Sequence, residues 1–422
     1  MAEKTTVLIV AHGHPDTDKG GGELAAYAHY RELAARPDID AYFMARAPAQ
    51  AGHGGTPFSL RNGGREVLWH SDMPDHFRFS QPNKHIVWHA FREFLATIRP
   101  HVVHFHHYLH IGIELLQEVK RFDPATRLVL TLHDYWAICH QHGQMVKTNP
   151  AIALCERAVP ADCARCFPQY SPGDFFLREL FIKSYFDLVD VFVAPSEFLR
   201  QRYIAWGIAP ERIVTLENGQ PPVTPPPPRP LADGEPRSRF AFFGQINPYK
   251  GVDVLVEAIE RLPVSTRKKI RIEIHGANLH LQTEAFRDRI LAQIEANKRY
   301  VCLAGSYRPD QLGRLMANTD WVVVPSVWWE NSPLVIQEAF SHRRPVICSD
   351  IGGMAEKVRH GVDGLHFRAG NAVDLARRLQ EAIETPGLWE RLYAQIPTPP
   401  SIDTTVDRLL MLYRTPELRP TT

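Results

Sequence analysis

The segment from Pro221 to Pro230 divides this chain of 422 residues into two parts, because seven of its ten residues are proline. Proline fixes φ and removes a backbone donor, so this stretch cannot form a helix interior or a central strand. Such a composition is typical of stiff, extended linkers. The sequence therefore predicts a first domain over 1–220, a linker over 221–237, a second domain over 238–398 and a final segment over 399–422.

Short apolar runs alternate with helical patterns on both sides of this linker. The alternation predicts parallel sheets with crossover helices, that is, two doubly wound, Rossmann-like α/β domains. Ligands of such sheets bind beyond the carboxyl ends of the strands, so we expect those ends to face one another across a cleft. The expected strands are Val7–Ala11, Ala41–Met44, Val102–Phe105, Leu128–Leu132, Val191–Ala194, Phe240–Phe243, Ile272–Ile274, Val301–Leu303, Trp321–Val324, Val346–Cys348 and Gly364–Phe367.

Charge and hydropathy exclude several classes of function. The formal net charge is +1, and neither half is basic enough to indicate nucleic acid as the main partner. No run of 18 apolar residues is present, so we expect no membrane span, while contact with the inner face of a membrane stays open. The first residues pass directly into a predicted strand without the profile of a signal peptide. We therefore expect a soluble, cytoplasmic enzyme.

The stretch from 320 to 340 carries the parts of a ligand site in order. Trp321–Val324 is a β-branched run that predicts a buried parallel strand, and Pro325 ends it. A loop with Glu330 follows, and Pro333 then suits the first turn of a helix that carries Glu338. The opening of that helix can bind a phosphate through backbone N–H groups, and a carboxylate further along can accept hydrogen bonds from a ribose. These residues predict a site for a nucleoside diphosphate that carries another polyhydroxyl group.

A glycine-rich loop follows the first predicted strand. Gly20, Gly21 and Gly22 precede a helix that begins near Leu24, and glycines at this position permit close approach of the backbone to a phosphate. The spacing is not that of the dinucleotide-binding fingerprint, and a flexible loop is the alternative interpretation.

Histidines are concentrated in the first half, with 16 of the 21 before residue 221. His133 stands at the carboxyl end of a predicted strand, a position that favours a functional role. His106 and His107 follow the preceding predicted strand and are further candidates. Asp134 can serve as an acceptor-side base or as a helix cap.

Four cysteines form a second group within 28 residues: Cys139, Cys155, Cys163 and Cys166. The last two have the spacing of a zinc knuckle, the first two complete a tetrahedral set, and His140 or His142 could substitute. Disulfides are not expected in a reducing cytoplasm. We therefore expect a structural zinc that pins an insertion over about 136–170, with free thiols as the alternative. Cys302 and Cys348 lie in predicted strands and are typical of buried small residues.

The pattern Glu330-x7-Glu338 resembles the signature of the retaining glycosyltransferases of family 4, which have the GT-B fold. Further stretches resemble elements of that family in the same order, and the likeness is strong over about 240–385 and looser over 5–220. These stretches are Phe243–Gly251, Gly305–Leu312, Ile351–Glu356 and Gly361–Leu365. The resemblance also implies that a last helix, Ile402–Tyr413, crosses back to pack on the first domain.

The resemblance implies an activity and assigns roles. It implies transfer of a hexose from a nucleotide-diphosphate sugar to a glycan or lipid-linked acceptor, in the synthesis of a cell-surface polysaccharide or glycoconjugate. Retention would follow from front-face attack, with the leaving phosphate deprotonating the acceptor and no cofactor or metal needed for catalysis. The implied catalytic residues are Lys250, Glu330 and His133. Of these, His133 would contact the donor sugar and Lys250 would neutralise the leaving diphosphate. The implied donor-binding residues are Gly21, Gly22, Gln245, Arg308, Asn331, Ser332, Pro333, Leu334 and Glu338.

One position departs from the family pattern. Typical members carry arginine where this chain has Gln245, so half of the usual cationic clamp on the diphosphate is missing. Arg308, Lys19 or Arg239 could replace it if one of these side chains folds inward.

Two alternative functions are compatible with the same residues. The first is a GT-B nucleotide-sugar isomerase, which would act without an acceptor. The second is a non-catalytic GT-B binding protein, which the joint presence of Lys250, Glu330 and Glu338 argues against.

Overall fold

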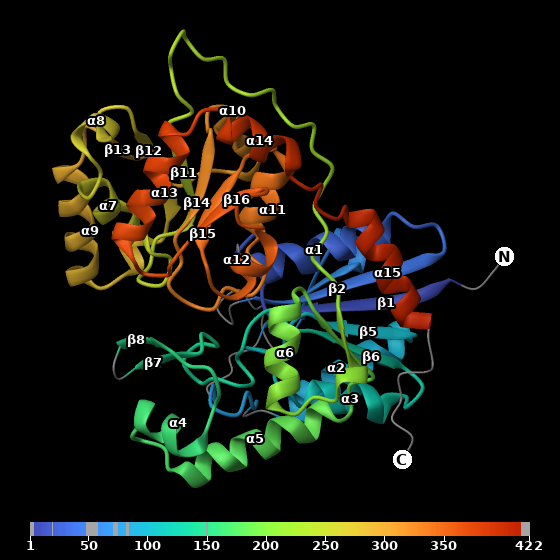
Figure 1. The fold of residues 1–422 in the computed structure, drawn as a ribbon. Helices are drawn as coiled ribbons and strands as arrows, with labels where there is room; N and C mark the ends of the chain where they lie inside the picture. The colour runs from blue at the N-terminus through green and yellow to red at the C-terminus, as the bar shows by residue number, and fades with distance from the viewer. Residues whose placement is uncertain are drawn as a thin grey trace. The chain divides into compact units, whose positions relative to one another are not determined.

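The computed structural model describes residues 4–18, 20–47, 58–70, 75–81, 84–148 and 151–414 (Figure 1). The chain divides into two compact units. Unit 1 comprises Met1–Gly219 and Pro400–Thr422, and unit 2 comprises Gln220–Pro399. Each unit is built on a largely parallel sheet with accompanying helices, which confirms the predicted α/β class.

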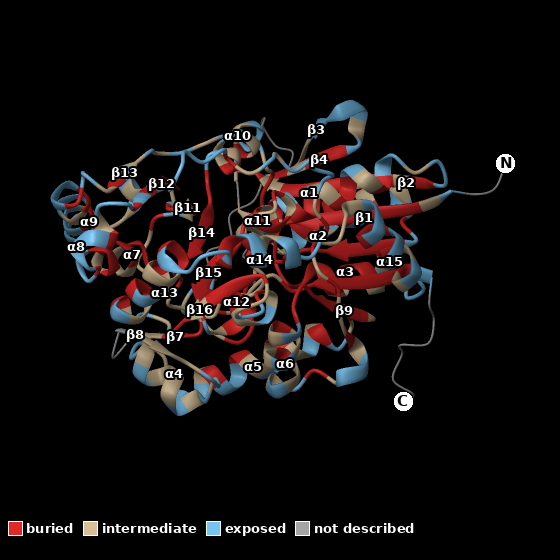
Figure 2. Ribbon diagram, turned by 45° about the horizontal axis from the view of Figure 1, so that its top comes forward, coloured by how far each residue is buried: buried red, intermediate tan, exposed pale blue. Residues whose placement is uncertain are grey.

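The sheet of unit 1 contains eight strands: β1 (Thr5–Ala11), β2 (Ile39–Ala47), β3 (Phe58–Arg61), β4 (Glu66–His70), β5 (Val102–Phe105), β6 (Arg127–Thr131), β9 (Val191–Ala194) and β10 (Ile213–Thr215). Their order is β10-β9-β6-β5-β1-β2-β4-β3, and every neighbouring pair is parallel except β3 with β4. The five predicted strands are present, whereas the sequence does not predict β3, β4 or β10. Six of the seven residues of β1 are buried, as a central strand covered on both faces requires (Figure 2).

The helices of unit 1 are α1 (Gly21–Ala34), α2 (Lys84–Ile98), α3 (Leu115–Phe122), α4 (Pro160–Cys166), α5 (Pro172–Phe186), α6 (Glu197–Trp206) and α15 (Ile402–Arg414). A separate antiparallel hairpin of β7 (Val146–Thr148) and β8 (Ala151–Leu154) precedes α4. Together, β7, β8 and α4 occupy the insertion predicted over about 136–170.

The last helix, α15, belongs to unit 1 although it follows unit 2 in the sequence. Val406 and Leu409 are fully buried in the apolar cluster that α1 forms with β1 and β2. Tyr413 anchors the end of the helix, because its hydroxyl lies 2.7 Å from Nδ1 of the buried His104 on β5. Unit 1 therefore closes its core with residues from both ends of the chain.

The sheet of unit 2 contains six parallel strands: β11 (Arg239–Gln245), β12 (Arg271–Ala277), β13 (Val301–Leu303), β14 (Trp321–Val324), β15 (Val346–Ser349) and β16 (Gly364–Phe367). Their order is β13-β12-β11-β14-β15-β16, so the winding reverses between β11 and β14. All six agree with the predicted strands. The helices are α7 (Val252–Glu260), α8 (Val264–Arg267), α9 (Glu284–Ala296), α10 (Leu312–Ala317), α11 (Leu334–Ser341), α12 (Gly352–Lys357), α13 (Ala372–Glu384) and α14 (Leu388–Gln395).

Alternate residues of β11 bury on opposite faces of this sheet. Phe240 and Phe242 pack in the cluster formed with α7, α9, α13 and α14. Ala241 and Phe243 pack in the cluster formed with α10, α11 and α12. The sheet of unit 2 thus lies between two packed layers of helices, and loops at the end of its strands carry the site residues.

The proline-rich segment 221–237 forms no helix or strand, as its composition predicts (Figure 1). It is nevertheless anchored on unit 2 through Asp320, which is 1% exposed. One carboxylate oxygen of Asp320 lies 3.0 Å from Nη2 of Arg229, and the other lies 3.3 Å from Nη1 of Arg237. The carboxylate also accepts the backbone N–H of Arg239 at 3.1 Å. Ion pairing therefore holds this segment on the start of β11 and β14.

We expect Asp320→Ala to destabilise unit 2 by about 3–5 kcal/mol, because it removes the buried carboxylate that pairs with Arg229 and Arg237. Urea unfolding followed by tryptophan fluorescence measures the effect. The control is Glu257→Ala, which removes an exposed helical ion pair with Arg261 and should leave the unfolding midpoint almost unchanged. Equal, small effects of both substitutions would show that Asp320 does not anchor the segment.

Candidate functional site

The carboxyl ends of β11 and β14 form the topological switch point of unit 2, where open α/β sheets bind their ligands. These strands pair directly, with Phe240 opposite Trp321. The loop after β11 carries Lys250, and the loop after β14 carries Glu330. The predicted catalytic residues of unit 2 therefore leave the sheet from neighbouring strands and at the same edge.

Lys250 and Glu330 form a direct ion pair, with 2.6 Å between Nζ and Oε1. The same oxygen accepts hydrogen bonds from the Ser326 hydroxyl at 2.7 Å and from the Trp328 indole at 3.0 Å. Glu330 is 6% exposed. Burial opposes its ionisation, but the lysine and the two hydrogen bonds hold the pKa of Glu330 below its usual value. A carboxylate fixed by three donors has one orientation, as a group that positions a sugar requires.

Close backbone contacts at three glycines place this pair. A Cβ on Gly251 would lie 1.9 Å from the carbonyl oxygen of Pro325, so glycine lets the residue after Lys250 approach the end of β14. A Cβ on Gly353 would lie 1.7 Å from the carbonyl oxygen of Asn331, and the Gly353 N–H donates to the Glu330 carbonyl at 2.7 Å. Gly352 has φ of +60° and lies against the same loop. The paired glycines are therefore the support of the Glu330 loop.

The opening of α11 is built to receive an anion. Pro333 is the N-cap of the helix, one position before the predicted first turn, and Leu334 begins it. The first N–H groups of a helix have no acceptor within it and carry the positive end of the helix dipole. The Ser332 hydroxyl beside them is buried and has no hydrogen-bond partner among the described residues. Ser332, Pro333 and Leu334 thus lie where the sequence predicts, four residues or fewer after Glu330.

Glu338 lies on α11 and is half-buried. Burial raises its pKa to about 7. The carboxylate also raises the pKa of Tyr307, after burial, which places that phenol within electrostatic reach. Tyr307 belongs to the loop after β13, in a stretch from which the sequence analysis selects only Arg308. A carboxyl group with these surroundings can exchange a proton near neutral pH and accept hydrogen bonds from vicinal hydroxyls.

The replacement for the missing arginine at Gln245 is not supplied by Arg239. Gln245 is exposed at the carboxyl end of β11, whereas Arg239 begins the strand and lies about 20 Å away along it. Arg308 is exposed and pairs with Asp310 at 2.9 Å. Lys19 lies outside the described residues. Strand direction therefore excludes Arg239 from the three candidate replacements.

An open cavity of about 490 Å³ lies at the same edge of the sheet. The end of β12, the segment after it, α9 and the loop after β13 line it: Gly276, Ala277, Asn278, Leu279, His280, Arg287 and Ser306. Its walls combine backbone, amide and cationic groups with one leucine. Such walls suit a planar, polar group.

The switch point of unit 1 lies between β1 and β5, and histidines follow the strands there. His12 follows β1, His106 and His107 follow β5, and His133 follows β6. A Cβ on Gly22 would lie 3.4 Å from Cγ of His133. The structure thus brings His133 together with the predicted glycine loop, where Gly21 begins α1.

His133 is oriented by other histidines. Its Nε2 lies 2.9 Å from Nδ1 of His106, and Nε2 of His106 lies 3.3 Å from Nδ1 of His29. Burial lowers the pKa of His133 to about 3 and that of His29 to about 4. The imidazoles are therefore neutral at physiological pH, and each links to the next as a donor or an acceptor. Sequence analysis identifies His106 as a candidate ligand, whereas its contacts make it a support of His133.

Asp134 is held by a second histidine. Nδ1 of His107 accepts the backbone N–H groups of Tyr108 and Leu109, so its proton lies on Nε2 and is donated to Asp134 at 2.9 Å. The other oxygen of Asp134 accepts the Trp136 N–H at 2.8 Å and caps the turn that follows. Burial opposes ionisation, but the bond from His107 keeps the pKa of Asp134 below its usual value.

A histidine–carboxylate pair lies beside these neutral groups. Nε2 of His12 lies 2.9 Å from Oε1 of Glu23 on α1. Burial opposes protonation of His12, but Glu23 raises its pKa above the usual 6.5. The pair joins the end of β1 to the first turn of α1 beneath the glycine loop.

The four clustered cysteines line one small cavity in unit 1. As the side chains are placed, no three His, Cys, Asp or Glu groups in the described part of the chain are arranged to hold a metal ion. Cys348 is buried, as expected, but Cys302 is exposed on β13, which corrects its prediction as a buried residue. The zinc expected from the cysteine spacing stays a prediction.

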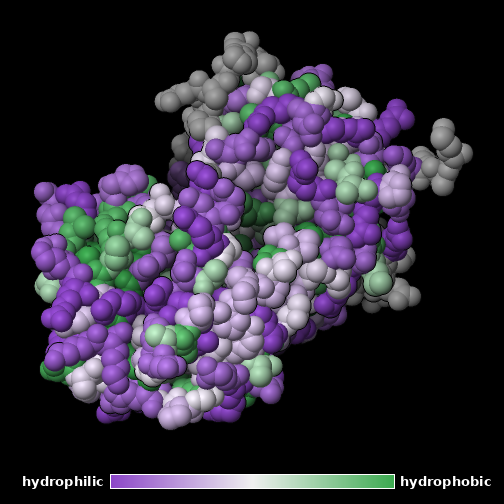
Figure 3. Space-filling model, turned by 90° about the horizontal axis from the view of Figure 1, so that it is seen from above, coloured by the Kyte–Doolittle hydropathy of each residue, from purple (hydrophilic) through white to green (hydrophobic). Residues whose placement is uncertain are grey.

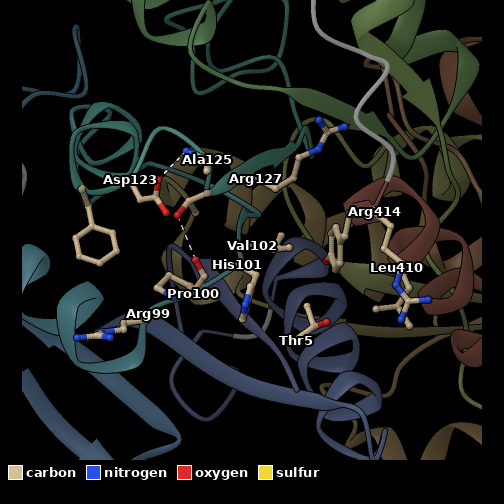
Figure 4. Close-up of a pocket in the computed structure, with 13 residues that line it drawn as sticks. Thr5, Arg99, Pro100, His101, Val102, Asp123, Ala125, Arg127, Leu410 and Arg414 are labelled. Carbon is tan, nitrogen blue, oxygen red and sulfur yellow. Dashed lines mark hydrogen bonds between the residues drawn. The ribbon is translucent and has the colours of Figure 1, made fainter. Parts of the chain in front are cut away.

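A larger cavity, of about 800 Å³, opens at the opposite edge of the unit 1 sheet (Figure 4). Thr5, Val102 and Arg127 begin β1, β5 and β6, and Leu410 and Tyr413 of α15 complete its wall. It lies at the amino ends of the strands, whereas His12, His106 and His133 follow the carboxyl ends. The cavity is thus a gap between strand ends and α15, separate from the candidate site.

None of the helices within the described ranges is long and apolar enough to cross a membrane. On the face drawn in Figure 3, hydrophilic residues predominate and hydrophobic residues form small, separated groups.

Two family models match the chain in succession. The model described as Glycosyltransferase Family 4 matches residues 19–222, and the model described as Glycosyl transferases group 1 matches residues 229–397. The second match contains the whole switch point of unit 2, including Lys250, Glu330 and Glu338. The chain belongs to the family 4 glycosyltransferases.

Curated relatives in the family match over parts of their length. The D-inositol 3-phosphate glycosyltransferase of Nocardia farcinica is 34% identical over 152 residues, 35% of this chain and 33% of that protein. The lipopolysaccharide 1,2-N-acetylglucosaminetransferase of Salmonella typhimurium is 28% identical over 265 residues, 61% of this chain and 58% of that protein. The chain thus spans about a third of the first of these relatives and under two thirds of the second.

Two solved structures of other proteins have the same fold as this chain over nearly its whole length. Sucrose-phosphate synthase from Thermosynechococcus elongatus superposes with a TM-score of 0.72 at 17% identity, over 97% of this chain and 98% of that one. Anabaena HepE, solved in complex with UDP and glucose, superposes with a TM-score of 0.64 at 16% identity, over 97% and 99%. The likeness establishes the GT-B fold predicted from the motifs.

We expect Gly353→Ala to displace the Glu330 loop, because the new methyl group meets the Asn331 carbonyl oxygen. The clash should cost about 1–3 kcal/mol in the free energy of unfolding. Gly313→Ala is the matched control, since a methyl group there meets only the His342 ring at an ordinary 3.7 Å. Urea unfolding of both variants measures the difference. A Gly353→Ala protein as stable as Gly313→Ala would show that the loop does not need the glycine.

Proposed function

We propose that this glycosyltransferase moves a hexose from a nucleoside-diphosphate sugar to a hydroxyl group of a glycan or lipid-linked acceptor, with retention at the anomeric carbon. The observation that carries the proposal is the Lys250–Glu330 pair at the switch point of unit 2, four residues before α11. The names of the relatives support a sugar donor and a polyhydroxyl or glycan acceptor, and the HepE complex supports UDP as the nucleotide.

The negative charge of the leaving diphosphate needs a positive partner as the glycosidic bond breaks. Lys250 can supply it while still bound to Glu330, because an ammonium group has three donors. The free N–H groups of α11 and the unpaired Ser332 hydroxyl are further donors. Ser332 and the α11 amides thereby take the role that arginine at position 245 has in typical members.

The ribose is assigned to Glu338, and the nucleobase to the polar cavity after β12 and β13. Glu338 lies on α11 one turn beyond the expected phosphate position. Ser306 of the cavity wall and Tyr307 beside Glu338 are consecutive residues, so the two sites adjoin along one loop. A nucleoside-diphosphate sugar bound in this order would direct its sugar toward Glu330.

In the proposed transfer, the acceptor oxygen bonds to the anomeric carbon as the bond from that carbon to the phosphate oxygen breaks. The acceptor proton passes to the leaving phosphate oxygen. Because attack and departure take place on the same face, the configuration is retained and no protein nucleophile is needed. Glu330 orients the sugar hydroxyls while the ring gains positive charge. From unit 1 we assign His133 as a further contact of the sugar, held by His106.

Donor-dependent release of nucleoside diphosphate, measured with and without acceptor, tests the reaction class. Release that requires an acceptor and yields an α-linked product from an α-linked donor supports the proposal. Isomerised nucleotide sugar without release would establish the isomerase alternative. Tight binding with neither product would establish the non-catalytic alternative.

We expect Glu338 to make nucleotide binding depend on pH. Ribose hydroxyls donate to the ionised carboxylate, so affinity is full above the pKa of about 7 and falls as the pH drops below it. Glu338→Gln should remove this step, and Glu338→Ala should weaken binding about 10- to 100-fold through loss of a charge-assisted bond. Calorimetry with UDP from pH 5.5 to 8.5 measures both effects.

Comparison with the wild type under the same conditions cancels the titration of the nucleotide phosphate itself. Glu295→Gln, an exposed carboxylate on α9, is the control and should keep the wild-type profile. A Glu338→Gln protein with an unchanged affinity and profile would contradict the ribose assignment.

We expect Glu330→Gln to lower kcat by roughly 100-fold, the scale of one electrostatic contact made in the transition state. The amide keeps the shape and can still accept from Ser326 and Trp328, so the KM for donor should change little. His133→Ala should lower kcat in the same way. Full turnover by Glu330→Gln, or an inverted product, would overturn the assignment while leaving the fold intact.

A further inference from the structure

The insertion of unit 1 places four thiols around one small cavity. Cys139 follows β6, Cys155 directly follows β8, and Cys163 and Cys166 lie three residues apart on α4. The cavity measures about 30 Å³, which suits a single water molecule or ion. Helical spacing puts the two α4 cysteines on one face. Three separate chain segments therefore contribute cysteines to the lining of one small cavity.

The later part of the insertion has little apolar core, because no described residue over 153–170 is buried. No residue of α4 is buried, and β7 and β8 form a hairpin of three and four residues. The described hydrogen bonds across the insertion include Thr148 Oγ1 to the Cys166 carbonyl and the Cys155 N–H to the Met145 carbonyl. A hairpin and a seven-residue helix without a core are usually held by disulfides or a metal. None of the four cysteines forms a disulfide, so no such bond provides the link.

A buried cation beside the cavity calls for negative charge. Arg178 of α5 is 2% exposed and donates to the carbonyl oxygens of Phe77, Trp136 and Ala137. Within the described ranges no carboxylate forms an ion pair with it, although buried charges are normally paired. Cys139 and Cys163 are within its electrostatic reach. Thiolates at the cavity would compensate this guanidinium.

The sulfur of Cys139 has hydrogen-bond donors beside it. Backbone N–H groups of Gln141 and Met145 are directed at this sulfur. N–H donors of this kind commonly support the sulfur ligands of a metal.

We propose that Cys139, Cys155, Cys163 and Cys166 bind one structural zinc ion, whose tetrathiolate charge is complemented by the buried Arg178. Binding releases four protons and leaves a site of net charge −2. As placed, the side chains are not arranged around an ion, so the sulfurs must turn inward to the roughly 2.3 Å of a Zn–S bond. The ion would join β8, α4 and the segment after β6, and it takes no part in sugar transfer.

The first test is metal content. Protein purified without added metal should contain about one zinc per chain, and Cys163→Ser should lose most of it. Cys302→Ser is the control, because Cys302 is exposed in unit 2 and should not affect the zinc. Cobalt substituted for zinc should show thiolate charge-transfer absorption and the bands of a tetrahedral site.

The second test uses the wild-type chain and does not depend on a variant that folds. Native protein should expose one reactive thiol, Cys302, and a chelator should expose four more while lowering the melting temperature. Nucleotide binding at unit 2 is measured in parallel, so loss of zinc is separable from failure of the donor site. A metal-free protein whose four thiols react at once, or one that contains two disulfides, would overturn the proposal.

Discussion

The pairing of β11 with β14 is the constraint on which the site of unit 2 depends. Because the two strands are parallel neighbours that connect in opposite directions, the loops after them leave one edge of the sheet with a gap between them. Lys250 and Glu330 enter that gap from either side, and Gly251 brings the backbones close enough for a direct ion pair. The helix that follows β14 then points its first turn toward the same place. The meeting of the Lys250–Glu330 pair with the opening of α11 is thus a consequence of strand order.

The sequence predicts the parts of this arrangement that local pattern determines. The run Trp321–Val324 is buried throughout, and the order of strand, loop and helix around Glu330 agrees with the prediction. It does not predict the partners of Glu330, since Ser326 and Trp328 become donors only once their loop closes on itself. Nor does the sequence show that Arg239 is remote from the site, because that distance depends on the direction in which β11 runs. Tyr307 and the anchoring of the proline-rich segment by Asp320 likewise depend on contacts between distant parts of the chain.

Unit 1 shows two ways of placing ionisable groups in an interior. His29, His106 and His133 are neutral and link to one another by hydrogen bonds, so their rings are held together without net charge. Arg178 stays buried with its guanidinium donating to three backbone carbonyl oxygens. The spacing of the four cysteines already groups them in the sequence, but only the fold shows that three histidines form a hydrogen-bonded chain.

The placement of α15 has a consequence for folding during synthesis on the ribosome. Unit 2 is a continuous stretch inserted into a discontinuous unit 1, whose apolar cluster includes Val406 and Leu409. Synthesis delivers the β1 and α1 side of that cluster first and its cover nearly 400 residues later. Unit 2 can therefore complete its core while unit 1 still exposes an apolar face to the chaperones that attend the growing chain. Unit 1 is therefore the first unit to be synthesised and the last to complete its apolar core.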